Sequence, residues 1–207
     1  MKTILESGVI TDILNDGSGV LVIPAEATDV LNSLLFSYAF EDVETIKIAD
    51  GNTHFSYRNG CLIHNETKTL IVGLHNCSIP NDGSVEVIGL NALGCNTKID
   101  TLTIPEGVLM LDVGCFSGTE IQKITLPKSI ELVRGNSFGV CKKLREVVVL
   151  GEHTEFEPAA FGKILNDGSP MPRQISECVH PDLIIKGHRS SSAEKCAEIN
   201  EIRFETL

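Results

Sequence analysis

A pattern of alternating aliphatic residues recurs at nearly constant spacing over residues 99–161, and it constrains the fold more than any other feature of the chain. The motif L-x-x-L-x-L, in which L is any aliphatic residue, begins at Ile99 and returns after 22 and then 23 residues, at Ile121 and Leu144. Phenylalanine recurs at the same two spacings, and the residues concerned are Phe116, Phe138 and Phe161.

The alternation predicts one short strand per repeat, because residues two apart lie on the same face of a strand. A single repeat of about 23 residues buries too little apolar surface to offset the entropy of ordering it, so neighbouring repeats must stack. A period of 20–29 residues with this pattern is typical of leucine-rich repeats. We therefore predict a repeat solenoid that is mainly β, with a parallel sheet, short irregular or helical connections and one short C-terminal helix. The phenylalanines should form an internal ladder on the far side of the core.

Related strand motifs extend the array to about eight rungs, which we assign to a single domain over residues 1–207. Residues 9–23 are interpreted as a hairpin that turns at 15–19, because this segment holds Asp-Gly and a second Gly between two apolar runs. Residues 191–194 form a capping box that opens the C-terminal helix. The last apolar residues of the eight predicted strands are Ile23, Ile48, Ile79, Ile104, Leu126, Val149, Ile185 and Phe204.

Two segments interrupt the period. Residues 51–74 carry Asn59-Gly60 between two apolar runs, a strong signal for a hairpin, and we interpret them as an inserted β-ribbon that projects from the sheet edge. Residues 162–182 contain three prolines and an Asn-Asp-Gly-Ser turn, and we interpret them as a loop insertion.

Residues 104–116 and 126–144 resemble the BspA-like leucine-rich repeat, whose units read roughly I-P-x-x-V-x-x-I-G-x-x-A-F-x-x-C-x-x-L. Residues 187–200 resemble the segment that often closes such arrays, and residues 59–63 resemble the family's N/D-G-V-L-Y ribbon. The resemblance implies a bacterial or parasite protein, often on the cell surface, that functions in adhesion and binds host or matrix proteins. It brings no catalytic residues to this chain.

The cysteines show no pattern of a metal or redox motif. Their number is odd, no C-x-x-C occurs, and most occupy rung positions that small apolar residues otherwise fill, so we expect reduced structural thiols and a reducing compartment. The close Cys/His pairs at 75–77 and 178–180 supply too few ligands for zinc. With no phosphate loop or nucleophile motif, we expect no cofactor, no metal and no enzyme activity. The seven cysteines are Cys61, Cys77, Cys95, Cys115, Cys141, Cys178 and Cys196.

Charge and hydropathy exclude other partners. The formal net charge of −11 opposes binding to a phosphate backbone, so no nucleic acid is expected. No stretch approaches the ~20 apolar residues of a membrane span. The first residues also lack the apolar segment of an export signal, so the chain as given is expected to be cytoplasmic. It is also expected to be a monomer.

The open face of the predicted sheet is the candidate binding site, because solenoids commonly bind partners on such a face. The outward residue of each strand forms a row without an acid, in a strongly acidic chain: Val22, Lys47, Ser78, Thr103, Thr125, Val148, Ile184 and Arg203. Thr101, Lys123 and Glu146 should form the adjoining row. We predict a non-catalytic protein-binding module of the adhesion type whose concave strip is Ser78, Thr101, Thr103, Lys123, Thr125, Glu146 and Val148.

Three alternatives remain open at this point. First, β-branched residues favour strands whether or not a partner binds, and this preference alone explains the composition of the outward row. The chain could instead be a hydrolase or thiol enzyme with a site in the 51–74 ribbon or the 162–182 loop. It could also be a purely structural spacer.

Overall fold

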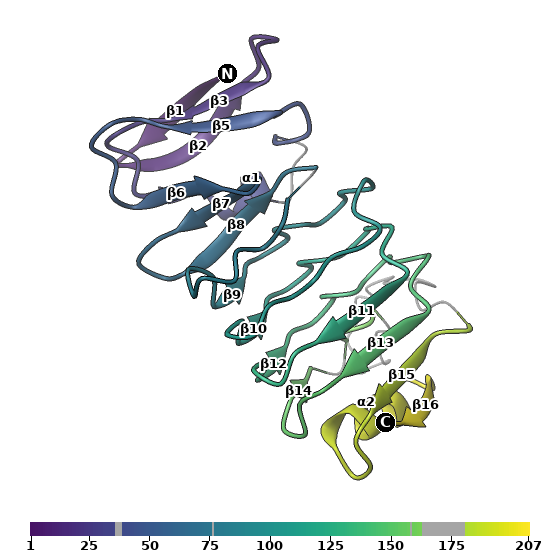
Figure 1. Cartoon of the computed structure of the whole chain (residues 1–207). Helices are drawn as coiled ribbons and strands as arrows, with labels where there is room; N and C mark the ends of the chain where they lie inside the picture. The colour runs from purple at the N-terminus through teal and green to yellow at the C-terminus, as the bar shows by residue number, and fades with distance from the viewer. Residues whose placement is uncertain (36–38, 76, 158, 163–180) are drawn as a thin grey trace, which may run out of the picture.

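The computed structural model describes residues 1–35, 39–75, 77–157, 159–162 and 181–207. The chain winds along one axis, with the N-terminal strands at one end and the C-terminal helix at the other (Figure 1). The predicted fold class, a mainly β solenoid with a parallel sheet and one short C-terminal helix, is confirmed. The predicted loop insertion at 162–182 lies almost wholly outside the described residues.

The N-terminal end consists of short strands that pair in two small sheets. β1 (Lys2–Glu6) and β2 (Val9–Leu14) are antiparallel, and β2 pairs in parallel with β4 (Asp29–Val30), which precedes α1 (Asn32–Leu35). β3 (Val20–Ile23) pairs in parallel with β5 (Thr45–Ile48). The hairpin predicted over 9–23 is therefore wrong. The tight turn lies instead at Ser7 and Gly8, which both adopt the positive φ that a two-residue hairpin turn requires.

The predicted hairpin at Asn59-Gly60 is confirmed, since β6 (Phe55–Arg58) and β7 (Cys61–His64) are antiparallel and both turn residues have positive φ. The ribbon does not project from the sheet, however. β8 (Thr69–Gly73) pairs with β7 on one side and in parallel with β9 (Val87–Ile88) on the other. The ribbon thus continues into a seven-stranded sheet, and the apolar side chains of β7 are buried in the interior.

β7 forms a wall between two hydrophobic cores. Cys61 and Ile63 pack into the C-terminal core, whereas Leu62 between them packs into the N-terminal core, and all three are fully buried. Alternating side chains of one strand therefore serve both cores, as the two-residue period of a strand requires. An apolar run in place of alternation is the sequence signature of such doubly buried strands.

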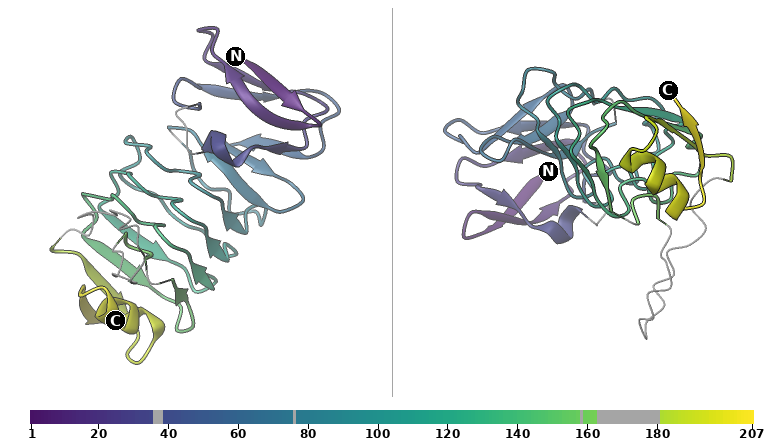
Figure 2. Two further views of the ribbon diagram at one scale, coloured as in Figure 1. Left: turned by 180° about the vertical axis from the view of Figure 1, so that it is seen from behind. Right: turned by 90° about the horizontal axis from the view of Figure 1, so that it is seen from below.

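The rungs beyond this wall build two sheets (Figure 2). The four-stranded parallel sheet consists of β11 (Lys123–Leu126), β13 (Glu146–Val149), β15 (Ile184–Gly187) and β16 (Arg203–Thr206). The other sheet continues from β9 through β10 (Met110–Leu111), β12 (Leu132–Val133) and β14 (Glu155–Phe156). Helix α2 (Ser192–Ile199) begins at the predicted cap, where the Glu194 N–H donates to the Ser191 hydroxyl oxygen.

Two of the predicted strands are not formed. Within the described chain, residues 77–80 and 101–104 form no strand, so the predicted parallel sheet is interrupted between β5 and β11. The sheet β9–β10–β12–β14 was not predicted. Its strands are two residues long, too short to show an alternation.

The predicted phenylalanine ladder is confirmed. Phe116 and Phe138 stack with ring centroids 5.5 Å apart, and Phe138 and Phe161 stack at 5.4 Å. All three side chains are buried. The backbone follows the same stacking, because the Phe116 N–H donates to Ser137 O and the Phe138 N–H donates to Ala160 O, both at 2.9 Å.

Phe138→Ala should lower the free energy of unfolding by about 3–5 kcal/mol, because Phe138 is the central ring and its loss removes contacts with both neighbours. Urea denaturation followed by circular dichroism measures the change. Ile199→Ala, at a half-exposed position of α2, is the control and should change the value by under about 0.5 kcal/mol. A loss below about 1 kcal/mol in Phe138→Ala would show that the ladder is not a principal support of the fold.

Candidate functional site

The four-stranded sheet presents one face inwards and one outwards. Along β11, Ile124 and Leu126 are buried, whereas Lys123 and Thr125 are exposed. Parallel pairing places Lys123 beside Glu146 and Thr125 beside Val148. The structure therefore brings four of the seven predicted strip residues together on two neighbouring strands.

The other three strip residues are Ser78, Thr101 and Thr103. They are exposed, but they lie on the segments at 77–80 and 101–104, which form no strand in the described chain. The predicted strip is thus continuous only over β11 and β13.

The register of the last two strands differs from the prediction by two residues. Val148 pairs with Lys186, and Lys186 with Glu205, so Ile184 and Arg203 belong to the adjoining row. The expectation of an acid-free row is therefore wrong. The cause is Gly187, which occupies the last inward position of β15, where a Cβ would lie 3.2 Å from the Cβ of Ala193 in helix α2. Because β15 ends on a glycine, its last apolar residue, Ile185, lies two positions before the strand's last inward position. An alignment of the strands by their last apolar residues is therefore displaced by two residues at β15.

A chain of ion pairs crosses this outward face. Glu146 lies at its centre, with the Lys123 Nζ 2.5 Å from one carboxylate oxygen and the Lys186 Nζ 2.7 Å from the other. Lys186 also lies 3.6 Å from Glu205, which pairs with Arg203 at 2.6 Å. Three cations and two acids leave this face with a local net charge of about +1, whereas the whole chain carries −11.

The ion pairs change the titration of their members. The hydrogen bonds from Lys123 and then Lys186 hold the pKa of Glu146 below its ordinary value of 4.5, and the hydrogen bond to Glu146 raises the pKa of Lys186. Because folding lowers the Glu146 pKa, these contacts stabilise the folded state above pH 4.5, and their contribution is lost as the pH falls through the folded-state pKa.

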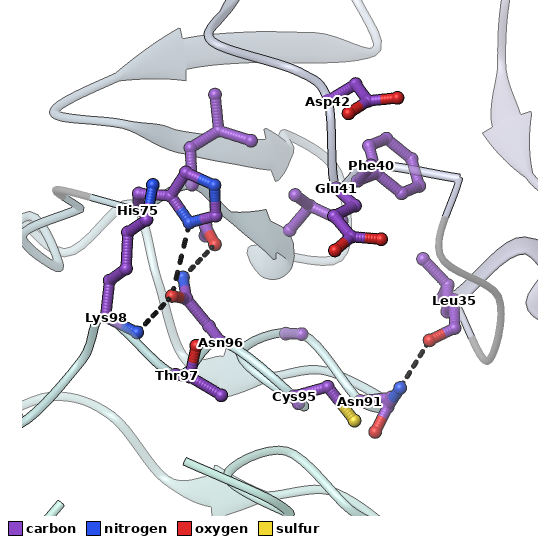
Figure 3. Close-up of a pocket in the computed structure, with 15 residues that line it drawn as sticks. Leu35, Phe40, Glu41, Asp42, His75, Asn91, Cys95, Asn96, Thr97 and Lys98 are labelled. Atoms are coloured by element: carbon purple, nitrogen blue, oxygen red, sulfur yellow. Dashed lines mark hydrogen bonds between the residues drawn. The ribbon is translucent and has the colours of Figure 1, made fainter. Parts of the chain in front are cut away.

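A pocket of about 460 Å³ lies between the segment after α1 and the turn at 91–98 (Figure 3). Phe40, Glu41 and Asp42 line one side, and His75 and Lys98 lie on the other. No sequence pattern indicated this pocket, because its walls come from turns that are distant in the sequence.

Asn96 organises the second wall of the pocket. Its side-chain oxygen lies 3.4 Å from the His75 Nδ1 and accepts the Lys98 N–H at 3.2 Å, while its amide donates to Gly73 O. His75 therefore contacts an amide and not a nucleophile. Among the described residues, the pocket offers polar contacts for a ligand but no paired nucleophile and base, which an enzyme site of the thiol or hydrolase class would need.

The cysteines divide into buried and accessible thiols, and Cys115 and Cys141 are buried as predicted. The prediction that Cys95 is also a core residue is wrong. Cys95 has a φ of 58°, in a turn where Gly118 and Val140 of the next rungs also have positive φ, and its side chain is exposed at the rim of the pocket. Burial raises the pKa of the Cys115 thiol and raises that of Cys196 to about 12.

Two further kinds of feature are absent among the described residues. These hold no group of three or more His, Cys, Asp or Glu side chains placed to bind a metal ion. Nor do they include a helix of the length and hydropathy needed to cross a membrane.

Stacked rungs of 22–23 residues around an internal phenylalanine ladder define a leucine-rich-repeat solenoid. Residues 69–167 match the family model described as the BspA type leucine rich repeat region, in six copies. The protein thus carries a BspA-type leucine-rich-repeat region, and the predicted resemblance is confirmed.

Solved structures that are similar to this chain include two that cover most of its length. A leucine-rich repeat protein from Eubacterium ventriosum is 20% identical, with a TM-score of 0.55 over 73% of this chain and 49% of its own, which shows a shared fold. The pneumococcal vaccine antigen PcpA is 10% identical, with a TM-score of 0.44 over 91% of this chain and 56% of its own. The chain thus spans about half the length of each structure. Among curated proteins, no sequence matches it.

The exposure of the thiols predicts their reactivity. In native protein, Cys95 should react with a maleimide reagent much faster than Cys115 and Cys141, because only exposed thiols meet the reagent without unfolding. Timed labelling followed by peptide mass spectrometry measures the three rates, and a denatured sample shows the rate of each thiol without protection. Equal native rates at Cys95 and Cys115 would contradict the buried position of Cys115.

The Glu146 ion pairs should be visible in the pH dependence of stability. Glu146→Gln should lower the free energy of unfolding most at pH 7, and the difference from the parent should shrink as the pH falls below 4.5. Guanidinium denaturation at several pH values measures this difference. Glu152→Gln, at an exposed turn position, is the matched control and should show no such trend. A pH-independent difference for Glu146→Gln would show that the carboxylate charge is not what stabilises the sheet face.

Proposed function

We propose that this protein is a non-catalytic binding module that docks another protein on the outward face of β11, β13, β15 and β16. The observation that carries the proposal is an outward face of four parallel strands whose charged side chains are already paired with one another. A repeat solenoid that binds through an open sheet face is a common arrangement.

The face is prepared for binding in two ways. Backbone pairing on both sides fixes β13 and β15, so that little main-chain entropy remains to be lost when a partner docks. The side chain of Glu146 is only 19% exposed and that of Lys186 only 30%, because each is held between charged neighbours. Ordering these side chains therefore adds little to the cost of association.

The chemistry of the face favours a partner with a mixed apolar and polar surface. Val148 and Ile184 are partly exposed on adjacent strands, and Thr125 lies beside Val148. The register pairs Glu146 with Ile184 and Val148 with Lys186, so the Glu146–Lys186 ion pair runs between the two aliphatic side chains. A partner can cover these aliphatic side chains while it hydrogen-bonds to the charged ones, and because the charges are paired within the face, it need not supply strong charge of its own.

An adhesion role is the biological context that we infer for this module. The BspA-like resemblance of the repeats supports it, and host or extracellular-matrix proteins are the partner class that this resemblance implies. The pocket bounded by Glu41, His75 and Lys98 holds no assembled catalytic pair among the described residues, which is consistent with a module that binds without catalysis.

Thr125→Asp tests the proposed face. The substitution places an unpaired carboxylate on β11, the first strand of the proposed face, and should weaken binding at least tenfold, whereas it should change the free energy of unfolding by under about 0.5 kcal/mol. Partners are found by screening the immobilised chain against purified extracellular-matrix proteins, and affinities are measured by biolayer interferometry.

Lys142→Asp is the matched control, because it also introduces an acid at an exposed position but lies in the turn before β13. It should bind like the parent. If the control loses binding and Thr125→Asp keeps it, the sheet face is not the docking site.

A further inference from the structure

Two cysteines meet at the junction between the wall strand β7 and the first rung after it. Cys61 lies directly opposite Gly73 in the antiparallel pairing of β7 and β8. Opposite residues of an antiparallel pair point to the same face, with their Cβ positions about 4.5–5.5 Å apart. The Cys77 sulfur lies 2.8 Å from the position that a Cβ on Gly73 would occupy. Cys77 thus fills the place of the cross-strand neighbour of Cys61.

The backbone holds the two thiols in this arrangement. A Cβ on Gly60 would lie 2.9 Å from the Cα of Cys77, which shows how closely this segment approaches the turn before Cys61. The Leu74 N–H donates to Gly60 O and the Ser78 N–H to Asn59 O, both at 2.8 Å. These hydrogen bonds flank Cys77 on both sides. The Cys61 sulfur in turn lies 3.7 Å from Ser78 O.

We propose that Cys61 and Cys77 form a reversible dithiol–disulfide pair, oxidised by low-molecular-weight disulfides such as oxidised glutathione. The two thiols differ as this chemistry requires. Cys77 is partly exposed and can meet a soluble disulfide, whereas Cys61 is fully buried and can react only with its neighbour.

The contact between the thiols also assigns their roles. The hydrogen bond from the Cys61 thiol lowers the pKa of Cys77, and the same contact together with burial raises the pKa of Cys61. Cys77 therefore carries the thiolate more readily and is the attacking group, since the thiolate is the nucleophile in disulfide exchange.

The reaction balances in two exchanges. The Cys77 thiolate attacks one sulfur of oxidised glutathione, forms a mixed disulfide and releases one glutathione thiolate, which takes up a proton. Cys61 then loses its proton to solvent and attacks the Cys77 sulfur, which forms the Cys61–Cys77 bond and releases the second glutathione. In total the protein loses two hydrogens and one oxidised glutathione becomes two reduced ones.

The test uses the full chain in buffers of graded oxidised-to-reduced glutathione ratio, quenched with acid, alkylated and mapped by mass spectrometry. We expect a peptide that links Cys61 to Cys77, with the loss of two alkylatable thiols, and its complete reversal by a reducing agent. The exposed Cys95 serves as an internal control, because its glutathionylation shows that the oxidant is active.

Two serine variants separate the steps. Cys61→Ser should retain one glutathione on Cys77, because the resolving thiol is absent, and Cys77→Ser should leave Cys61 reduced. If either variant fails to fold, the map of the parent chain still decides the matter. The proposal is overturned if Cys77 keeps glutathione beside a free Cys61, if Cys77 links to another cysteine, or if both stay reduced while Cys95 is modified.

Discussion

The stacking of one rung on the next is the interaction on which the rest of this structure depends. A rung of about 23 residues cannot bury enough apolar surface alone, so each depends on the backbone hydrogen bonds and side-chain contacts of its neighbours. The phenylalanine ladder shows the principle, because each ring fills the core of its own rung and covers the ring of the next. The turns repeat it in the backbone, where successive rungs share hydrogen bonds at equivalent positions.

The N-terminal part does not follow this period, and β7 shows how the two parts remain connected. Its side chains alternate between two cores, so the strand closes the regular array and supports the irregular end at once. The same strand positions Cys61 beside Cys77. The junction is therefore both the place where the repeat pattern breaks and the place where a covalent link between β7 and the segment that follows β8 can form.

Features of the fold could be predicted from the sequence where a particular side chain marks them. The period, the ladder and the Asn59-Gly60 turn follow from residues whose chemistry allows few alternatives. The register at Gly187 could not be predicted, because the inward position that marks it has no side chain and the reason lies in the packing of α2. The exposure of Cys95 was missed for a related reason. Free cysteine is usually a buried residue, but Cys95 lies in a turn with left-handed backbone conformation, and its side chain is exposed there.

The proposed docking face and the proposed thiol pair lie in different parts of the array, and the nearest-neighbour character of a solenoid separates their effects. Cys77 precedes a segment that forms no strand, and the rung at 101–104 lies between it and β11. A disulfide at the wall would restrain β7, β8 and the segment at 77–80. It could affect the Glu146 ion pairs only through the intervening rungs, and the effect should weaken with each rung because a rung contacts only its neighbours. Oxidation should therefore restrain the junction around β7 and leave the binding face unchanged.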